Sequence, residues 1–426
     1  MKKSLTILLL CLCPTLSMAQ LLRGKDACFD KNIKTIQLLK AGSEMTVPII
    51  ELNSSEQLTL SFDDLSNESR NFKYKIIHCD ADWSKSNLFY SDYINGFEED
   101  NIYNYQSSFN TLVSYIHYKL NIPNDNMRIT ASGNYLLQVF NDDGENELVF
   151  QKSFSVVEYM PQVKIKSSSR NIPLAGNPKC SQQIEFNLEY SRLNVQIPQN
   201  DIKVRIEQNG FRQPGIAPPS PTFTRSGYID YTQYNKNVYT GVSEFRNFDI
   251  TSFEYRSLTV RKIQIVDKQY HVLLDQDKPP KQYLYQRDIN GSYVVRNVRY
   301  EQQSDTESDY ANVHFSLFMP EPLNGNVYLF GQLTNGELTN SYSMLYNSAR
   351  QCYELTLLVK QGYYNYKYVY IDESGEIDWS AIDGCSSESE NVYGIYVYNK
   401  GTGDRYDKLV NVTWLSSQSS MNQFGR

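Results

Sequence analysis

The sequence has few of the side chains that most enzymes use for chemistry. It contains four histidines among 426 residues, namely His78, His117, His271 and His314. No His-x-x-x-His, Cys-x-x-Cys or Gly-x-Ser-x-Gly pattern occurs, and no phosphate loop or dinucleotide fingerprint follows an expected strand. We therefore expect no catalytic residues, no cofactor and no metal, with each histidine in a structural role in or at the end of a strand.

One acidic pattern leaves a cation site open as an alternative. Asp80 and Asp82 lie two residues apart, and Glu98, Glu99 and Asp100 follow in a loop. Calcium requires several oxygen ligands at tuned spacing, and two aspartates alone are a weak pattern for it. Turn formation is the favoured interpretation of this pair.

Clustered positive charge is also missing. The formal net charge is −7, and the acidic excess is spread along the chain. Because phosphate contacts need grouped cations, this charge pattern argues against a nucleic-acid partner.

Long hydrophobic runs are confined to the first residues. Lys2 and Lys3 precede an apolar stretch, Leu5–Cys13, and Ser17-Met18-Ala19 offers small residues for cleavage. This order is typical of a secretory signal peptide over residues 1–19, with cleavage before Gln20. A lipoprotein acceptor at Cys11 is the less favoured alternative, because three leucines precede it. No other segment reaches the length of a spanning helix, so we expect an exported chain without a membrane span.

Cysteine is sparse as well, since five remain after such a cleavage. An odd number at wide spacings does not form a disulfide scaffold. Cys352 could pair with Cys385, and Cys28 could pair with Cys79 or Cys180, although an exported chain does not require any of these bonds. For Cys79 we favour a buried small hydrophobe over a reactive thiolate, because its neighbour His78 points to the opposite face of a strand.

What the chain has in abundance is aromatic residues in strand-like patterns. It contains 34 tyrosines, and aromatic residues make up 13% of the sequence, which favours strands over helices. Phe72–Ser84 alternates and then enters a turn at the two aspartates, Ser108–Asn124 contains a second run, and Gly133–Phe140 a third. The sequence predicts an all-β protein of β-sandwich domains.

A chain of this length is too long for a single core. We expect three tandem immunoglobulin-like sandwiches after the signal peptide, with a polar linker at 301–309 and a tail that is poorly ordered beyond Trp414. The expected boundaries are 1–19 for the signal peptide, 30–157, 158–300 and 310–400 for the three β domains, and 401–426 for the tail.

Several of these stretches in this order resemble a known family. They are Tyr74–Trp83, Asn95–Asp100, Ser108–Thr111 followed by Tyr115–Tyr118, and Ser132–Leu137. Together they resemble the first domain of the type IX secretion system plug proteins of Bacteroidetes-type bacteria. The resemblance is specific over about residues 30–157. It implies a non-catalytic periplasmic protein, held at the inner face of the outer membrane, that caps the periplasmic mouth of a large outer-membrane translocon barrel while no cargo passes.

A second resemblance supports an alternative function. Asn326–Gln332 and Tyr353–Tyr370 resemble the early-set immunoglobulin-like modules that precede starch-acting enzymes, which implies a possible glycan-binding protein. Leu333-Thr334-Asn335-Gly336 stands where such modules carry a sugar-stacking tryptophan. Trp379 and Tyr364 are the remaining candidates for sugar contacts.

Two loops are candidates for contact with a protein partner. The first holds seven aromatic residues within 23 positions, namely Trp83, Phe89, Tyr90, Tyr93, Phe97, Tyr103 and Tyr105. They either pack on their own sheet or form a contact surface, since interface hot spots favour such residues. The second loop, Arg212–Gly227, contains Pro218 and Pro219 and is either a docking segment or a stiff exposed loop.

Overall fold

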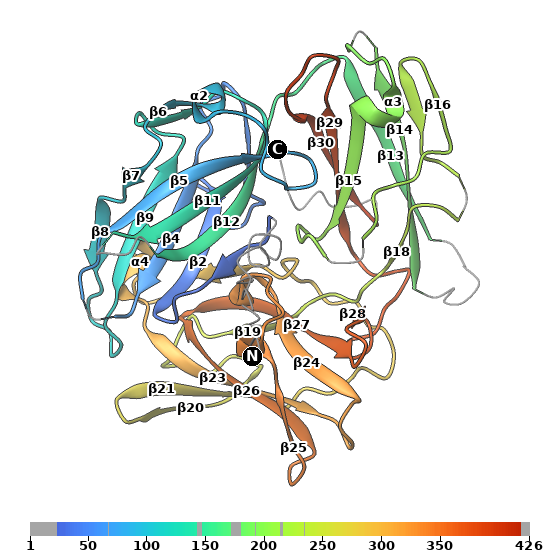
Figure 1. Cartoon of the computed structure of the whole chain (residues 1–426). Coiled ribbons are helices and arrows are strands. Elements are labelled where there is room, and N and C mark those ends of the chain that lie inside the picture. Colours follow the sequence, from blue (N-terminus) through green and yellow to red (C-terminus); the bar gives the residue numbers. More distant parts are fainter. Residues whose placement is uncertain are drawn as a thin grey trace, which may run out of the picture.

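The computed structural model describes residues 24–418, except 67, 143–146, 172–179, 192, 214–215 and 234. The expected signal peptide lies outside the described residues. Nearly every described element is a β-strand, and the strands form facing sheets in three units (Figure 1). The prediction of an all-β, sandwich-type fold is confirmed. Within the described ranges, no helix is long and apolar enough to cross a bilayer.

The first unit spans residues 24–158 and is drawn from blue to teal in Figure 1. One sheet has the order β1-β12-β11-β5-β7 with β3 beside β12, the facing sheet has the order β2-β4-β9-β8, and β6 pairs with β10. The elements are β1 (Ala27–Cys28), β2 (Ile33–Lys40), β3 (Ile49–Glu51), β4 (Leu58–Asp64), β5 (Phe72–Cys79), α2 (Tyr90–Tyr93), β6 (Ile94–Gly96), β7 (Asp100–Asn101), β8 (Asn104–Ser107), β9 (Ile116–Ile122), β10 (Met127–Ile129), β11 (Gly133–Asn141) and β12 (Leu148–Val157).

The side chains that alternate along the predicted strands form the core of this unit. Phe72, Tyr74, Ile76 and His78 of β5 are all buried, as a period of two predicts. The Tyr118 ring of β9 stacks on a phenylalanine of β4 and meets Phe72 edge-on at 4.9 Å. The expected strand around residue 113 begins only at Ile116, because the preceding loop is bound to the third unit.

The second unit combines two separate stretches of the chain. Its sheets have the orders β13-β14-β17-β16, with β18 on β14, and β15-β29-β30. The elements are β13 (Val163–Asn171), β14 (Ser181–Tyr190), α3 (Pro198–Asp201), β15 (Ile202–Gln208), β16 (Phe223–Arg225), β17 (Tyr228–Asp230), β18 (Val238–Thr240), β29 (Val392–Asn399) and β30 (Lys408–Ser416). Its core joins Ile184 and Phe186 to Ile395 and Val397.

The third unit lies between these two stretches in sequence. Its sheets have the orders β20-β21-β23-β26-β25 and β19-β27-β22, with β24 and β28 also on β27. The elements are β19 (Arg246–Asp249), β20 (Val260–Val266), β21 (Gln269–Leu274), β22 (Tyr293–Val295), η1 (Glu301–Gln303), α4 (Ser304–Glu307), β23 (Tyr310–Phe318), β24 (Gly325–Phe330), η2 (Gln332–Thr334), η3 (Asn340–Tyr342), β25 (Leu345–Asn347), β26 (Cys352–Lys360), β27 (Gly362–Asp372) and β28 (Ile377–Asp378).

The three cores therefore do not follow the three stretches of sequence that we expected. β19, β20 and β21 lie in the expected 158–300 domain but contribute to the core of the third unit. β29 lies in the expected third domain but pairs with β15, and β30, which lies in the expected tail, pairs with β29 in the same sheet. Residues 408–416 form a strand whose Leu409 and Val410 are fully buried, so order extends beyond Trp414.

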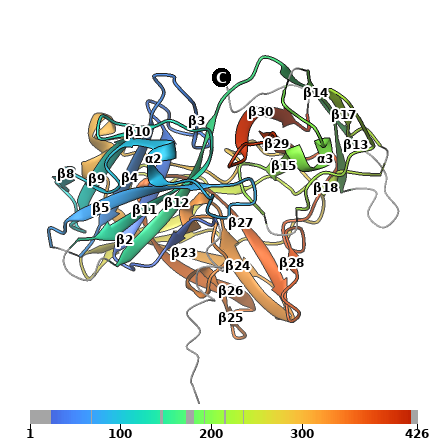
Figure 2. The same ribbon diagram turned by 45° about the horizontal axis from the view of Figure 1, so that its top comes forward.

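The three units meet around a small common cavity. Figure 2 shows the first and second units side by side, with the third unit packed beneath them. The cavity has a volume of about 100 Å³ and is lined by residues of all three units, among them Asp26, Trp83 and Lys152 from the first, Glu207 and Arg212 from the second, and Gln332 and Asn335 from the third.

Candidate partner-binding surface

The segment of the first unit from residue 89 to residue 112 exposes six large apolar side chains. We name this set the aromatic edge, and it consists of Phe89, Phe97, Tyr103, Tyr105, Phe109 and Leu112. Phe89 is 74% exposed and Tyr103 is 71% exposed, and the other four are also exposed. Scattered single apolar residues are normal on a protein surface, whereas six exposed in one segment make that segment a candidate interaction site.

The sheet topology places part of this segment at the edges of the two facing sheets. β7 pairs with β5 as the outer strand of one sheet, and β8 pairs with β9 as the outer strand of the facing sheet. The chain between them crosses from one sheet to the other along the open side of the sandwich. Ile102 lies midway through this crossing, is buried, and holds the crossing against the core.

The structure divides the predicted aromatic contacts into exposed and buried groups. Phe89 and Phe97 are exposed and Tyr90 is half-buried, but Tyr93 is 6% exposed and belongs to the core. Tyr93 packs against Tyr90 with ring centroids 5.5 Å apart. Phe109 was not predicted, because it lies beyond Tyr105, the last residue of the aromatic stretch identified in the sequence.

Trp83 differs most from the expectation. It is 7% exposed, with a left-handed backbone conformation, and it packs between two arginines of the second unit. The guanidinium carbons of Arg205 and Arg212 lie 5.2 and 3.7 Å from its ring centroid. Arg212 also donates a hydrogen bond of 2.7 Å to the hydroxyl of Ser153. Trp83 therefore joins the first and second units through cation–π contacts and is not available to a partner in this structure.

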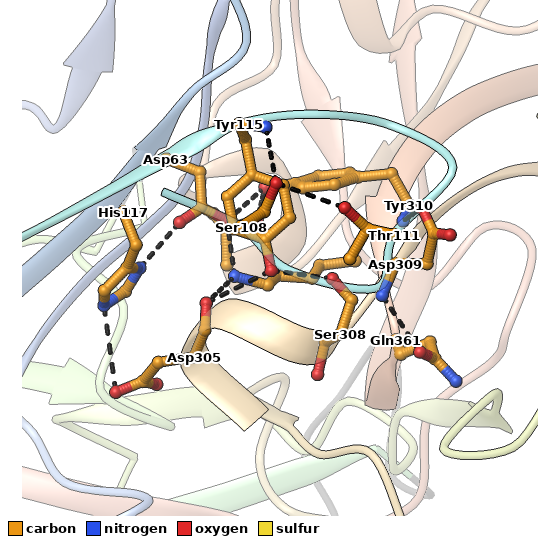
Figure 3. A network of polar contacts seen from close by, with 12 residues as sticks. Asp63, Ser108, Thr111, Tyr115, His117, Asp305, Ser308, Asp309, Tyr310 and Gln361 are labelled. Carbon is orange, nitrogen blue, oxygen red and sulfur yellow. Dashed lines mark hydrogen bonds and ion pairs between the residues drawn. The ribbon is translucent and has the colours of Figure 1, made fainter. Parts of the chain in front are cut away.

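A polar network fixes the far end of the aromatic edge to the third unit (Figure 3). The carboxylate of Asp309 accepts hydrogen bonds from the backbone N–H groups of Leu112 and Val113. The hydroxyl of Tyr115 donates to the carbonyl of Ser308 at 2.8 Å. The N–H of Phe109 donates to the carbonyl of Thr306 at 3.0 Å. The loop that carries Phe109 and Leu112 is thus held in one position.

At the centre of this network lies a buried ion pair between the two units. Asp63 of β4 accepts from the Lys360 ammonium and from the hydroxyl of Tyr310, each at 2.6 Å. His117 Nδ1 lies 2.6 Å from the other carboxylate oxygen of Asp63. Burial alone would raise the pKa of Asp63, but Lys360 and His117 outweigh it and hold that pKa below its ordinary value. The pair is a structural contact between the two units, because the Asp63 carboxylate is bonded to Lys360, Tyr310 and His117.

The other three histidines also have structural surroundings. His78 is buried, with Nδ1 2.8 Å from the Ser86 hydroxyl and Nε2 3.0 Å from the carbonyl of Ser132. His271 and His314 lie on neighbouring parallel strands with ring nitrogens 2.9 Å apart. In the parts of the chain that the structure describes, no three His, Cys, Asp or Glu side chains are grouped to hold a metal ion.

The aspartates considered for calcium make turn contacts instead. Asp82 accepts a hydrogen bond from the N–H of Ser84, and Asp80 accepts one from the N–H of Asp407. Asp80 therefore helps to bind the first unit to the second.

The proline loop lies on a different unit from the aromatic edge. Pro218 is exposed and Pro219 is half-buried, and they precede β16 in the second unit. Figure 1 places β16 and β8 at opposite sides of the molecule, so the two predicted contact loops do not form one surface.

The candidate sugar contacts in the third unit are not arranged as a platform. Tyr364 is 2% exposed and stacks on Phe248 at 5.0 Å inside the core. Trp379 is half-buried and packs edge-on against Phe330 at 4.9 Å.

Among the cysteines that the structure describes, Cys180 and Cys385 form a disulfide, while Cys28, Cys79 and Cys352 are free. None of the pairings considered from the sequence occurs. The bond joins the second unit to the segment that follows β28. Beside the bond, the backbones of Val242 and Cys385 form an isolated antiparallel β-bridge. The pair was missed because its cysteines lie in different expected domains.

Burial raises the pKa of the Cys79 thiol to about 12, so Cys79 is a packed hydrophobe, as predicted.

Comparison with known proteins shows that the first unit, which carries the aromatic edge, is similar to a known domain. Residues 33–158 match the family model for the first domain of type 9 secretion system plug proteins. A solved structure of a hypothetical protein from Parabacteroides merdae is similar to nearly the whole chain, with a TM-score of 0.87 and 33% sequence identity over 92% of this chain and 99% of that one. No curated protein matches the sequence.

Proposed function

Because residues 33–158 match the first domain of type 9 secretion system plug proteins, we propose that the chain binds the periplasmic side of an outer-membrane translocon barrel and seals it. The protein acts as a steric stopper with no catalytic residue of its own. The observation that carries this proposal is the aromatic edge, a fixed and exposed apolar surface on the unit that matches the plug domain.

The chemistry of this edge suits a reversible protein contact. Tyrosine and phenylalanine supply large, stiff contact area, and such residues dominate interface binding energy. Because the supporting loop is already held by the third unit, little conformational entropy is lost on binding.

The junctions between the units support the stopper role. The Asp63–Lys360 pair joins the first unit to the third, and the Trp83–Arg212 contact joins the first to the second. A body that blocks an opening must resist deformation, and contacts of this kind oppose hinge motion between domains.

A periplasmic location agrees with two independent features. The first residues have the pattern of a secretory signal, and Cys180 and Cys385 form a disulfide. Disulfides of this kind persist in oxidising compartments such as the bacterial periplasm and are rare in the cytosol.

The proposal is tested by capture from the native envelope. Tagged full-length protein is purified from detergent-solubilised outer membranes of the organism that produces it, and its partners are identified by mass spectrometry. We expect a large barrel component of the translocon in stoichiometric amount. Recovery of the chain with no such barrel would contradict the proposal.

A second experiment tests sealing itself. The purified barrel is reconstituted into vesicles that contain a fluorescent dextran, and the chain is added to the periplasmic face. We expect the leak of dextran to stop, whereas serum albumin at the same concentration leaves it unchanged. Continued leak at saturating concentrations of the chain would show a binding protein that does not seal.

A further inference from the structure

The geometry of β8 points to a particular mode of binding at the aromatic edge, and we propose that β8 accepts an extended strand of the barrel partner as an additional antiparallel or parallel neighbour. This inference rests on the proposed function and specifies the contact through which the partner is held. The partner segment is apolar, with lysine or arginine at one end.

The first observation is that β8 is an outer strand with an uncovered side. It ends the order β2-β4-β9-β8, and among the described residues no further strand pairs with it. All four of its residues are exposed. A strand of this kind presents a row of backbone donors and acceptors that another strand can bind.

The register identifies which backbone groups face outward. The N–H of Ser108 donates to the carbonyl of Tyr115, and the same register continues through Gln106 opposite His117. Hydrogen-bonded and non-hydrogen-bonded pairs alternate in an antiparallel ladder. The N–H and C=O groups of Tyr105 and Ser107 therefore point away from β9, toward the open side.

The second observation is that β8 lacks the protection that the longer outer strands carry. β2 and β20 each contain a bulge, and lysine or arginine residues occur in both and in β13. Bulges and charged residues are the usual means of preventing unwanted strand pairing. β8, with the sequence Asn-Tyr-Gln-Ser, has no charge, no proline and no bulge.

The third observation concerns the chemistry next to the strand. Tyr103 and Phe109 flank β8, and both are exposed, so an incoming strand would find apolar contacts at each end. Residues 89–112 contain four acidic and no basic residues. Arg405 pairs with Asp92 and Lys73 pairs with Glu99, which leaves Glu98 and Asp100 without an ion-pair partner among the described residues. This excess of negative charge favours a partner strand with a lysine or arginine at one end.

The test removes one outward donor without touching the ladder to β9. Ser107→Pro deletes the outward N–H, and Ser107→Ala keeps it and serves as the matched control. A second variant, Ser107→Lys, keeps the donor but places a charged side chain on the edge strand, which disfavours pairing with another strand. We expect the proline and lysine variants to capture at least about ten-fold less barrel than wild type from solubilised outer membranes, a loss of about 1.4 kcal/mol or more. The alanine variant should capture the same amount as wild type.

Photo-cross-linking locates the contact directly. A benzoylphenylalanine at Tyr105 should form a cross-link with a barrel peptide, whereas the same group at Leu345, which is 78% exposed on β25, should form none. Unchanged capture by both the proline and lysine variants, with thermal unfolding like that of wild type, would overturn the inference while leaving the plug function intact. Cross-links between two copies of the chain at Tyr105 would also overturn it, in favour of self-association. If wild type captures no barrel, the proposed function fails and this inference fails with it.

Discussion

Asp63 and Lys360 form an ion pair that water barely reaches, since their side chains are 0% and 1% exposed. Loss of one partner leaves an uncompensated buried charge, which costs about 3–5 kcal/mol. We predict that Lys360→Ala lowers the free energy of unfolding by about 3 kcal/mol in urea denaturation. Arg299→Ala, which breaks an exposed pair with Glu254, should cost less than about 1 kcal/mol. Equal costs for the two variants would refute the structural role assigned to the buried pair.

Glu337 provides a second prediction at the scale of a residue. Burial raises the pKa of this carboxyl from 4.5 to about 7, and its oxygen accepts the N–H of Cys28 at 3.0 Å. Between pH 4.5 and 7 the folded chain keeps a proton that the unfolded chain has lost, so this group lowers stability as pH rises. We predict that Glu337→Gln gains stability relative to wild type between pH 5 and pH 8, measured by thermal unfolding at each pH.

Comparison of wild type with Glu337→Gln separates the effect of Glu337 on stability from that of groups that act in the opposite direction. Asp63 and Asp26 have lowered pKa values, so they act in the other direction, and they are present in both proteins. A difference between wild type and Glu337→Gln that stays constant with pH would show that Glu337 does not titrate in this range.

At the scale of elements, the disulfide joins segments that are distant in sequence. Cys180 and Cys385 are 205 residues apart, so the bond restricts the unfolded chain strongly. We predict that Cys180→Ser with Cys385→Ser lowers the free energy of unfolding by about 2–4 kcal/mol. Dithiothreitol should destabilise wild type to a similar extent and leave the double variant unchanged. Equal sensitivity of both proteins to dithiothreitol would assign the effect to another site.

Individual strands were predictable where one face meets a core. The alternation in Phe72–Cys79 and Gly133–Asn141 matches β5 and β11 closely, because burial of one face imposes a period of two. Residues 84–107 were expected as a loop, yet they contain α2, β6, β7 and β8. These short elements have exposed faces, as in β8, so no alternation reveals them.

At the scale of the whole molecule, truncation tests whether the second unit is built from two separate stretches of the chain. If residues 401–426 were a tail, their removal would have little effect. In the structure their removal deletes β30, with Leu409, Val410 and Val412 buried. We predict that a chain ending at Lys400 loses protection from hydrogen exchange in β13, β14 and β15, while β5 and β11 of the first unit stay protected.

A shorter truncation is the control. Removal of residues 419–426 leaves β30 complete and should leave exchange in β14 and β15 at the level of wild type. Wild-type protection in the longer truncation would support the linear division of domains that the sequence suggested.

Residue types and short sequence patterns were enough to predict the secondary-structure class and the family that the first unit matches, and to show that familiar catalytic motifs are absent. These depend on residue type and on patterns within short windows, which side-chain chemistry and strand geometry impose locally. Contacts between distant segments bury Trp83, bring Cys180 to Cys385, place β29 and β30 in one sheet with β15, and leave β8 as an outer strand. Each of these is a choice between distant segments, and the free energy of packing between whole sheets makes that choice.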